Sequence, residues 1–314
     1  GEQNQTVWLV DWANPQANDF AIAEEVTVKG EHKKRPDLVL YVNGIALGVI
    51  ELKRSTVSVS EGIHQNLDNQ KKDFIRNFFT TMQLVMAGND TQGVRYGTIE
   101  THEKYYLEWK EPADPIHSDH VDLPGANLLD QHLTQLCSKA RFLELIHDFI
   151  VFDAGTKKTC RHNQYFGIRA AKAYIRRRDG GIIWHTQGSG KSLTMVWLAK
   201  WIRENVTDSR VLIITDRTEL DEQIEKVFSG VEEEILRTKS GADLVTRLHA
   251  HNPWLICSLV HKFGRSPEGE SDDEDDGSSD DFIADMRRSL PSDFSPKGQL
   301  FVFVDECHRT QSGK

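Results

Sequence analysis

Hydrophobic residues recur with two different spacings along this chain, and the change between them predicts two structural regions. In the first third, short apolar runs alternate with turn residues, and two runs, 35–42 and 45–53, flank Asn43-Gly44. Asn-Gly between two β-rich runs predicts a β-hairpin. The neighbouring patterns predict a small mixed α/β domain over residues 1–111, with strands at 7–12, 20–28, 82–87 and 94–99 and a helix at 60–79.

Strand-like and helix-like patterns alternate in the second half of the chain, which predicts a parallel sheet with crossover helices. We assign this domain to residues 161–314. Residues 112–160 begin with a Pro- and Asp-rich stretch, continue with helical spacing at 128–149, and are predicted to form a helical linker region. The predicted elements of the second domain are strands at 181–185, 211–215, 254–258 and 300–304 and helices at 167–178, 191–204, 218–228 and 240–250.

The amino-acid composition limits the classes of protein to which this chain can belong. The sequence has no apolar run of about 18 residues or more, so we expect no membrane span. Its four cysteines are scattered without metal-binding spacing, which favours reduced thiols and a cytoplasmic location. The formal net charge is −10, but nine negative charges lie between Glu268 and Asp281. We predict a disordered acidic insert at about 266–281, so the overall acidity does not exclude a DNA partner.

A glycine-rich turn at 181–192 follows an apolar run and precedes an amphipathic segment. Glycines let backbone N–H groups surround phosphate oxygens, while Lys191 adds a positive charge and the Ser192 hydroxyl can ligate Mg²⁺. The strict P-loop pattern has Gly or Ala where this chain has His185. We predict an ATP site whose phosphate-binding residues are Thr186, Gly188, Ser189, Gly190, Lys191 and Ser192.

Two carboxylates end the last apolar run of the chain. Asp305 at the end of the predicted strand 300–304 can hold Mg²⁺, and Glu306 can position the hydrolytic water. Gln164, upstream of the glycine-rich turn, has two open interpretations: an adenine contact, or an ordinary surface polar residue.

A second set of charged residues lies on the predicted hairpin. Asp37 and Glu51 can hold a divalent cation between paired strands, and Lys53 points to the same face as Glu51 because strand side chains alternate. A two-residue Asn43-Gly44 loop with a regular ladder would place the two carboxylates on opposite faces. An odd-length loop or a bulge at Gly44 restores them to one face, and we predict the odd-length loop.

The motif Pro36-Asp37…Glu51-x-Lys53 resembles that of PD-(D/E)xK nucleases, and the glycine-rich turn with Asp305-Glu306-Cys307-His308 resembles superfamily 2 helicases. In this order the motifs resemble the motor/restriction subunit of type I restriction–modification enzymes. Gln92-x-x-x-Tyr96 is similar to a signature of those subunits. The resemblance implies that these two residues contact DNA or support the nuclease site, although an ordinary strand-edge pair explains them equally well.

The resemblance also implies a PD-(D/E)xK domain followed by a RecA-like P-loop domain. It implies Mg²⁺ and ATP as cofactors, double-stranded DNA as substrate, and methyltransferase and specificity subunits as partners. The second RecA-like domain of such a motor does not follow in this sequence, so we expect little ATP hydrolysis and no translocation, with a complete nuclease site. Two alternatives stay open: a stand-alone repair helicase–nuclease, or a non-catalytic module for DNA docking or subunit assembly.

Overall fold

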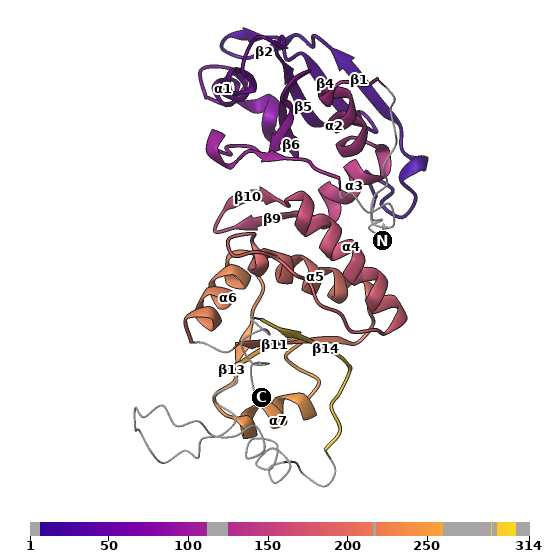
Figure 1. Cartoon of the computed structure of the whole chain (residues 1–314), viewed down its shortest axis with the longest axis vertical. Coiled ribbons are helices and arrows are strands. Elements are labelled where there is room, and N and C mark those ends of the chain that lie inside the picture. The colour runs from indigo at the N-terminus through magenta and orange to yellow at the C-terminus, as the bar shows by residue number, and fades with distance from the viewer. Residues whose placement is uncertain (1–6, 112–124, 216–217, 260–289, 291–293, 306–314) are drawn as a thin grey trace, which may run out of the picture. The chain divides into compact units, whose positions relative to one another are not determined.

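Contacts divide the chain after Ser189 into two compact units, Gly1–Ser189 and Gly190–Lys314 (Figure 1). The structure, a computed structural model, describes residues 7–111, 125–215, 218–259, 290 and 294–305, with the backbone alone for 218–223. The first unit contains a mixed sheet and the second an all-parallel sheet. The predicted α/β class is therefore confirmed at this level.

The main sheet of the first unit has six strands in the order β1-β4-β5-β6-β7-β8. All neighbours are antiparallel except β5 and β6, which run parallel and are connected through helix α1. A separate short hairpin joins β2 (Val28–Lys29) to β3 (Lys33–Lys34). The sheet strands are β1 (Phe20–Glu24), β4 (Leu38–Val42), β5 (Ile45–Leu52), β6 (Leu84–Asn89), β7 (Gly93–Gly97) and β8 (Leu107–Glu108).

The predicted hairpin at Asn43-Gly44 is present, but its loop has two residues, so the prediction of an odd-length loop was wrong. Val42 pairs with Ile45, and both turn residues have positive φ, at 50° and 79°. This is the conformation that Asn-Gly favours in tight hairpin turns. A register shift follows, because Tyr41 pairs with Ala46 while Leu40 pairs with Gly48. The extra residue that this β-bulge leaves in β5 is Leu47, not Gly44.

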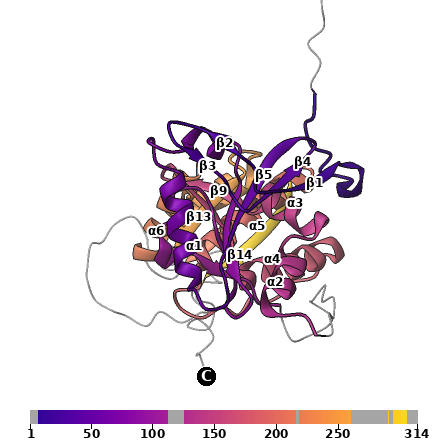
Figure 2. The same cartoon turned by 90° about the horizontal axis from the view of Figure 1, so that it is seen from above.

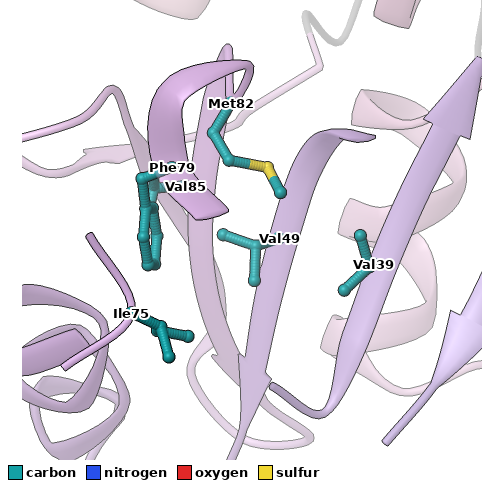
Figure 3. Close-up of a cluster of buried hydrophobic side chains, with 6 residues drawn as sticks. All are labelled: Val39, Val49, Ile75, Phe79, Met82 and Val85. Atoms are coloured by element: carbon teal, nitrogen blue, oxygen red, sulfur yellow. The ribbon is translucent and has the colours of Figure 1, made fainter. Parts of the chain in front are cut away.

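Helices cover both faces of this sheet (Figure 2). Helix α1 (Val59–Asn69) and the short 3-10 helix η2 (Arg76–Thr80) cover one face, where Val39, Val49 and Val85 of adjacent strands meet Ile75, Phe79 and Met82 (Figure 3). Helices α2 (Leu128–Leu136) and α3 (Lys139–Asp148) cover the other face. These two helices fall in the range predicted as a linker, and they complete the core of the first sheet.

An aromatic cluster continues the core of the first unit beyond the sheet. Trp109 is fully buried against Tyr165 and Phe166 of helix α4 (His162–Arg177), with ring centroids 5.2 and 5.6 Å away. Arg141 lies among these rings and forms a buried ion pair with Glu111. The hairpin β9 (Ile150–Asp153) and β10 (Thr156–Thr159) leads into α4, and two short 3-10 helices, η1 (Pro15–Ala17) and η3 (Glu103–Tyr105), lie earlier in the unit.

The second unit contains a four-stranded parallel sheet in the order β12-β13-β11-β14. None of the helices that the structure describes has the length and apolar character needed to cross a lipid bilayer. The strands and helices of the second unit are α5 (Lys191–Asn205), β11 (Ser209–Thr215), α6 (Thr218–Gly230), β12 (Leu236–Arg237), α7 (Gly241–His249), β13 (Leu255–Leu259) and β14 (Gln299–Val304). The predicted acidic insert at 266–281 lies outside the described residues.

Five predicted elements differ from the structure in more than their end residues. The predicted strand 20–28 is divided into β1 and β2, which belong to different sheets, and Glu25 between them has a positive φ of 49°. Residues 7–12 and 181–185 form no strand, although both are apolar, because an apolar run becomes a strand only where another strand pairs with it. Trp184 is 82% exposed. The predicted helix 60–79 ends at Asn69, whose carbonyl accepts a hydrogen bond from the Ile75 amide, and 128–149 is interrupted at Ser138, the N-cap of α3.

Gly30, in the turn between β2 and β3, provides a test of how this hairpin packs. A Cβ at this position would lie 2.1 Å from the Phe74 carbonyl oxygen, so backbone would have to move. We expect Gly30→Ala to destabilise the first unit by about 1–3 kcal/mol. The measurement is hydrogen exchange of β4 and β5 amides. Gly180→Ala is the control, because no atom lies within 4 Å of its added Cβ; equal exchange in both variants would contradict the packing.

Candidate functional site

Asp37 and Glu51 lie on the same face of the first sheet. Leu38 pairs with Ile50, and continuing this antiparallel register by one residue places Asp37 opposite Glu51. Paired residues in adjacent strands point to the same face, so both side chains project toward the face that α1 covers. Asp37 also accepts a 2.7 Å hydrogen bond from the Leu52 amide through Oδ2. The bulge in β5 thus produces the arrangement that the motif requires, by a different route from the one predicted.

Glu51 is fully buried, which is unusual for a carboxylate. The pKa of Glu51 is raised from 4.5 to about 8, mainly by burial and also by the negative charge of Asp37 and a hydrogen bond with it. The charges of Lys53 and Lys34 act in the opposite direction. A buried carboxyl group held beside a half-buried one is expected to share a proton or a cation with it.

Gln65 of α1 connects the carboxylate to the lysine. Its Nε2 donates to Glu51 Oε2 at 2.7 Å, and its Oε1 accepts from Lys53 Nζ at 2.6 Å. One turn later on the same helix face, Asn69 Nδ2 donates to Glu51 Oε1 at 3.3 Å. Sequence analysis missed Gln65 and Asn69. The available signal was their spacing of four residues on the helix face that carries Gly62 and packs against the sheet, where polar side chains need a polar partner.

Helix α1 approaches β5 closely because it carries glycine at position 62. A Cβ there would lie 3.0 Å from the Cβ of Ala87 and 3.4 Å from the Glu51 carbonyl oxygen. The helix begins after Ser58, whose hydroxyl accepts from the Ser60 amide at 3.2 Å. This close approach lets the Gln65 side chain reach Glu51 and Lys53.

The structure does not bring Gln92 and Tyr96 to the carboxylates. Gln92 Oε1 accepts from the Val59 amide at 2.8 Å, so this side chain supports the first turn of α1. Tyr96 is fully buried, and its hydroxyl donates to the Cys160 carbonyl at 2.8 Å. It lies on the opposite sheet face from Glu51, because its neighbour Arg95 occupies the row that contains Ala87 and Glu51. A DNA contact by Tyr96 is therefore incompatible with this structure.

The residues around Glu51 fit a divalent cation of the Mg²⁺ type. Such ions prefer oxygen ligands and are commonly held by one or two carboxylates together with water and phosphate. Asp37 and Glu51 supply two carboxylates, and the raised pKa of Glu51 is the property expected of a buried acid that lacks a compensating positive ion. Asn69 Oδ1 is buried and has no hydrogen-bond partner in the described part of the chain.

The glycine-rich turn has the backbone expected of a phosphate-binding loop. Gly188 and Gly190 have φ values of 76° and 86°, a conformation that side chains disfavour. The Ser189 amide and hydroxyl both donate to the Thr186 carbonyl, at 3.3 and 2.7 Å. Helix α5 begins at Lys191 directly after Gly190, so the amides of its first turn can bind an anion.

A pocket of about 400 Å³ lies on the first unit beside this turn. Arg161 and Asn163, from the start of α4, line it together with residues 184–189. Gln164 instead is buried and accepts a hydrogen bond from the Arg161 amide at 2.8 Å, which caps α4. The predicted adenine contact would require this capping bond to open. Sequence analysis missed Arg161 and Asn163, which carry no recognisable motif.

Asp305 follows the last residue of β14, and its amide donates to the Ile214 carbonyl at 2.9 Å. It thus lies at the carboxyl end of a parallel sheet, where ligands bind in open α/β folds. The hydroxyl-bearing Ser192 lies in the first turn of α5. The predicted Mg²⁺ ligation by Ser192 and Asp305 stays a prediction, and Glu306 lies outside the described residues.

Comparisons with known proteins match two regions of the chain to two families. Residues 1–104 match the family described as type I restriction enzyme R protein N terminus, and residues 163–314 match SWI2/SNF2 ATPase. The type I restriction enzyme HindI endonuclease subunit of Haemophilus influenzae is 25% identical, over 100% of this chain and 30% of that protein. The SsaAORF53P endonuclease subunit of Staphylococcus saprophyticus is 23% identical, over 94% of this chain and 30% of its own length. The chain spans about 30% of the length of the curated relatives it matches.

The burial of Glu51 predicts how stability depends on pH. The pKa is about 8 in the folded chain and near 4.5 in the unfolded chain, so ionisation of Glu51 destabilises the fold as pH rises between these values. Without divalent cations, we expect Glu51→Gln to stabilise the first unit by about 2–4 kcal/mol at pH 8 and by almost nothing at pH 4.5. Hydrogen exchange of β5 and β6 amides measures the difference.

The control for this experiment is Glu61→Gln, an exposed carboxylate on the same helix as Gln65. It should change stability by less than about 0.5 kcal/mol at either pH. A Glu51→Gln variant that is no more stable than the parent chain at pH 8 would show that Glu51 is not a strained buried acid.

Proposed function

Because this chain belongs to the type I restriction enzyme R proteins and corresponds to their N-terminal region, we propose that it carries the Mg²⁺-dependent endonuclease site of such an enzyme. The observation that carries the proposal is the convergence of Asp37, Glu51 and Lys53 on one sheet face, with Gln65 bonded to the last two. Glu51 lies in β5, Lys53 directly follows that strand, Asp37 directly precedes β4, and Gln65 lies on α1.

The proposed reaction is hydrolysis of a DNA phosphodiester. Asp37 and Glu51 would hold the divalent cation, which when bound would stabilise negative charge on the scissile phosphate. Lys53, whose Nζ is fixed by Gln65 Oε1 at 2.6 Å, orients the attacking water on the same face of the sheet. Gln65 and Asn69 direct the Glu51 carboxyl oxygens through their amide groups. Glu51 would bind the cation as an ionised carboxylate, because ligation requires that form.

A second proposed activity is ATP binding at the glycine-rich turn. The Gly188 and Gly190 backbone conformations and the adjacent pocket support it, as does the match to an ATPase family. In the proposed site, residues 186–192 hold the phosphates, Asp305 and Ser192 hold Mg²⁺, and Glu306 positions water. Translocation of double-stranded DNA is proposed for the whole protein, together with methyltransferase and specificity subunits as partners.

The two alternative functions make different demands on these residues. A non-catalytic docking module does not require a buried carboxylate with a raised pKa. Such a group destabilises the fold, and docking gives it no function that would offset this. A stand-alone repair nuclease would use the same site, and the matched relatives are named as restriction endonuclease subunits instead.

Replacement of Lys53 tests the endonuclease proposal. We expect Lys53→Ala to lower Mg²⁺-dependent cutting of plasmid DNA by the chain at least about 100-fold, the size typical of losing one group that acts in proton transfer or charge stabilisation. Lys110→Ala is the control, since Lys110 is an exposed lysine that pairs with Glu108 at 3.5 Å. Cutting that survives in Lys53→Ala, or that continues after removal of Mg²⁺ by EDTA, would contradict the proposal.

A further inference from the structure

The two lysines of strand β3, Lys33 and Lys34, point in opposite directions. Val28 pairs with Lys34, and Lys29 pairs with Lys33. Residues paired across antiparallel strands point to the same face. Val28 packs against the core cluster of Val39, Val49 and Val85, so Lys34 faces inward with it while Lys33 faces outward.

The Lys34 ammonium is held in place by an aromatic ring. Its Nζ lies 4.2 Å from the ring centroid of Phe74, in the segment that follows α1. The His32 ring lies 5.6 Å from the same ring. Gly30 brings the hairpin backbone against the Phe74 carbonyl, as the 2.1 Å approach of an added Cβ shows. Lys34 is therefore a positioned cation and not a lysine that samples many rotamers in solvent.

Within the described part of the chain, no carboxylate forms an ion pair with the Lys34 ammonium. Its neighbours differ in this respect, because Arg35 pairs with Glu25 at 3.2 Å and Lys71 pairs with Asp68 at 2.5 Å. Lys34 also lies close to the carboxylate pair. Phe74, against which it packs, precedes Ile75, whose amide donates to the Asn69 carbonyl at 3.1 Å, and Asn69 Nδ2 donates to Glu51 Oε1 at 3.3 Å.

We propose that Lys34 is a phosphate-binding residue of the nuclease site, which holds a backbone phosphate of the DNA strand beside the bond to be cut. The inference rests on the proposed endonuclease function. A DNA phosphate carries negative charge. It can therefore bind the Lys34 ammonium and, at the same time, the divalent cation that the two carboxylates hold. Lys53 is bonded to Gln65 and acts on water, so Lys34 supplies the second positive charge from a different structural element. The ring of Phe74 fixes its direction before DNA arrives.

The test is binding of a short DNA duplex to the chain at about 50–200 mM salt, with Ca²⁺ in place of Mg²⁺ to prevent cutting. A lysine that neutralises one phosphate contributes about 0.9 to the slope of log affinity against log salt. We expect Lys34→Ala to reduce the slope by about that amount and the affinity about 3- to 10-fold at the lower salt. Lys34→Met, which keeps an unbranched stem against Phe74, should give the same result.

Lys33→Ala is the matched control, one residue away on the outward face of the same strand. It should keep the salt slope of the parent chain. Equal slopes in the parent, Lys34→Met and Lys33→Ala would overturn the proposal, as would equal losses in the two lysine variants. If Lys34→Ala fails to fold, Lys34→Met decides the question.

A Lys53→Ala arm separates this inference from the proposed function. Loss of cutting in Lys53→Ala with an unchanged salt slope, together with a reduced slope in Lys34→Met, supports both. Loss of cutting in Lys53→Ala with a parental slope in Lys34→Met removes only the role of Lys34. Cutting that persists in Lys53→Ala removes the endonuclease proposal, and with it the assignment of Lys34 to a nuclease site.

Discussion

A single extra residue in β5 determines which side of the first sheet carries its charged groups. The side-chain period of a strand is two, so a regular ladder from the Asn43-Gly44 turn would place Asp37 and Glu51 on opposite faces. The bulge at Leu47 shifts the register by one residue and aligns them. Leu47 remains hydrogen-bonded at the bulge, because its carbonyl accepts a hydrogen bond from the Gln83 amide at 2.8 Å. The proposed metal site, the contacts of Gln65 and the position of Lys34 all depend on this alignment.

The proposed metal site positions its side chains precisely, but the buried Glu51 destabilises the metal-free fold locally. Helix α1 packs closely on β5 because of Gly62, and this packing excludes water from Glu51. Exclusion of water raises the pKa of the carboxyl group, so the metal-free fold carries a strained acid. Functional sites commonly keep such unfavourable groups because ligand binding relieves them. Here a divalent cation between Asp37 and Glu51 is the ligand that would do so, with Gln65 keeping Lys53 close.

The charged motif and the main hairpin could be predicted from the sequence, because Asn-Gly and the Asp37…Glu51-x-Lys53 spacing act locally. Gln65 could not be predicted with the same rules, since its role depends on how α1 packs against β5. The bulge was also beyond prediction in detail: sequence analysis required a register shift, but Leu47 has no feature that identifies it. At the second site the glycines and Lys191 predicted a turn before a helix, whereas the strand expected at 181–185 needs a pairing partner that local sequence does not specify.

The central claim is that Asp37 and Glu51 together bind a divalent metal ion. The most direct measurement is a crystal structure of the chain soaked in Mn²⁺, with anomalous diffraction to locate the ion. We expect an anomalous peak between the two carboxylates, at about 2.0–2.3 Å from an oxygen of each. A well-ordered site in which Glu51 keeps its hydrogen bonds to Gln65 and Asn69 but no peak lies beside Asp37, at saturating Mn²⁺ and pH above 8, would contradict the account.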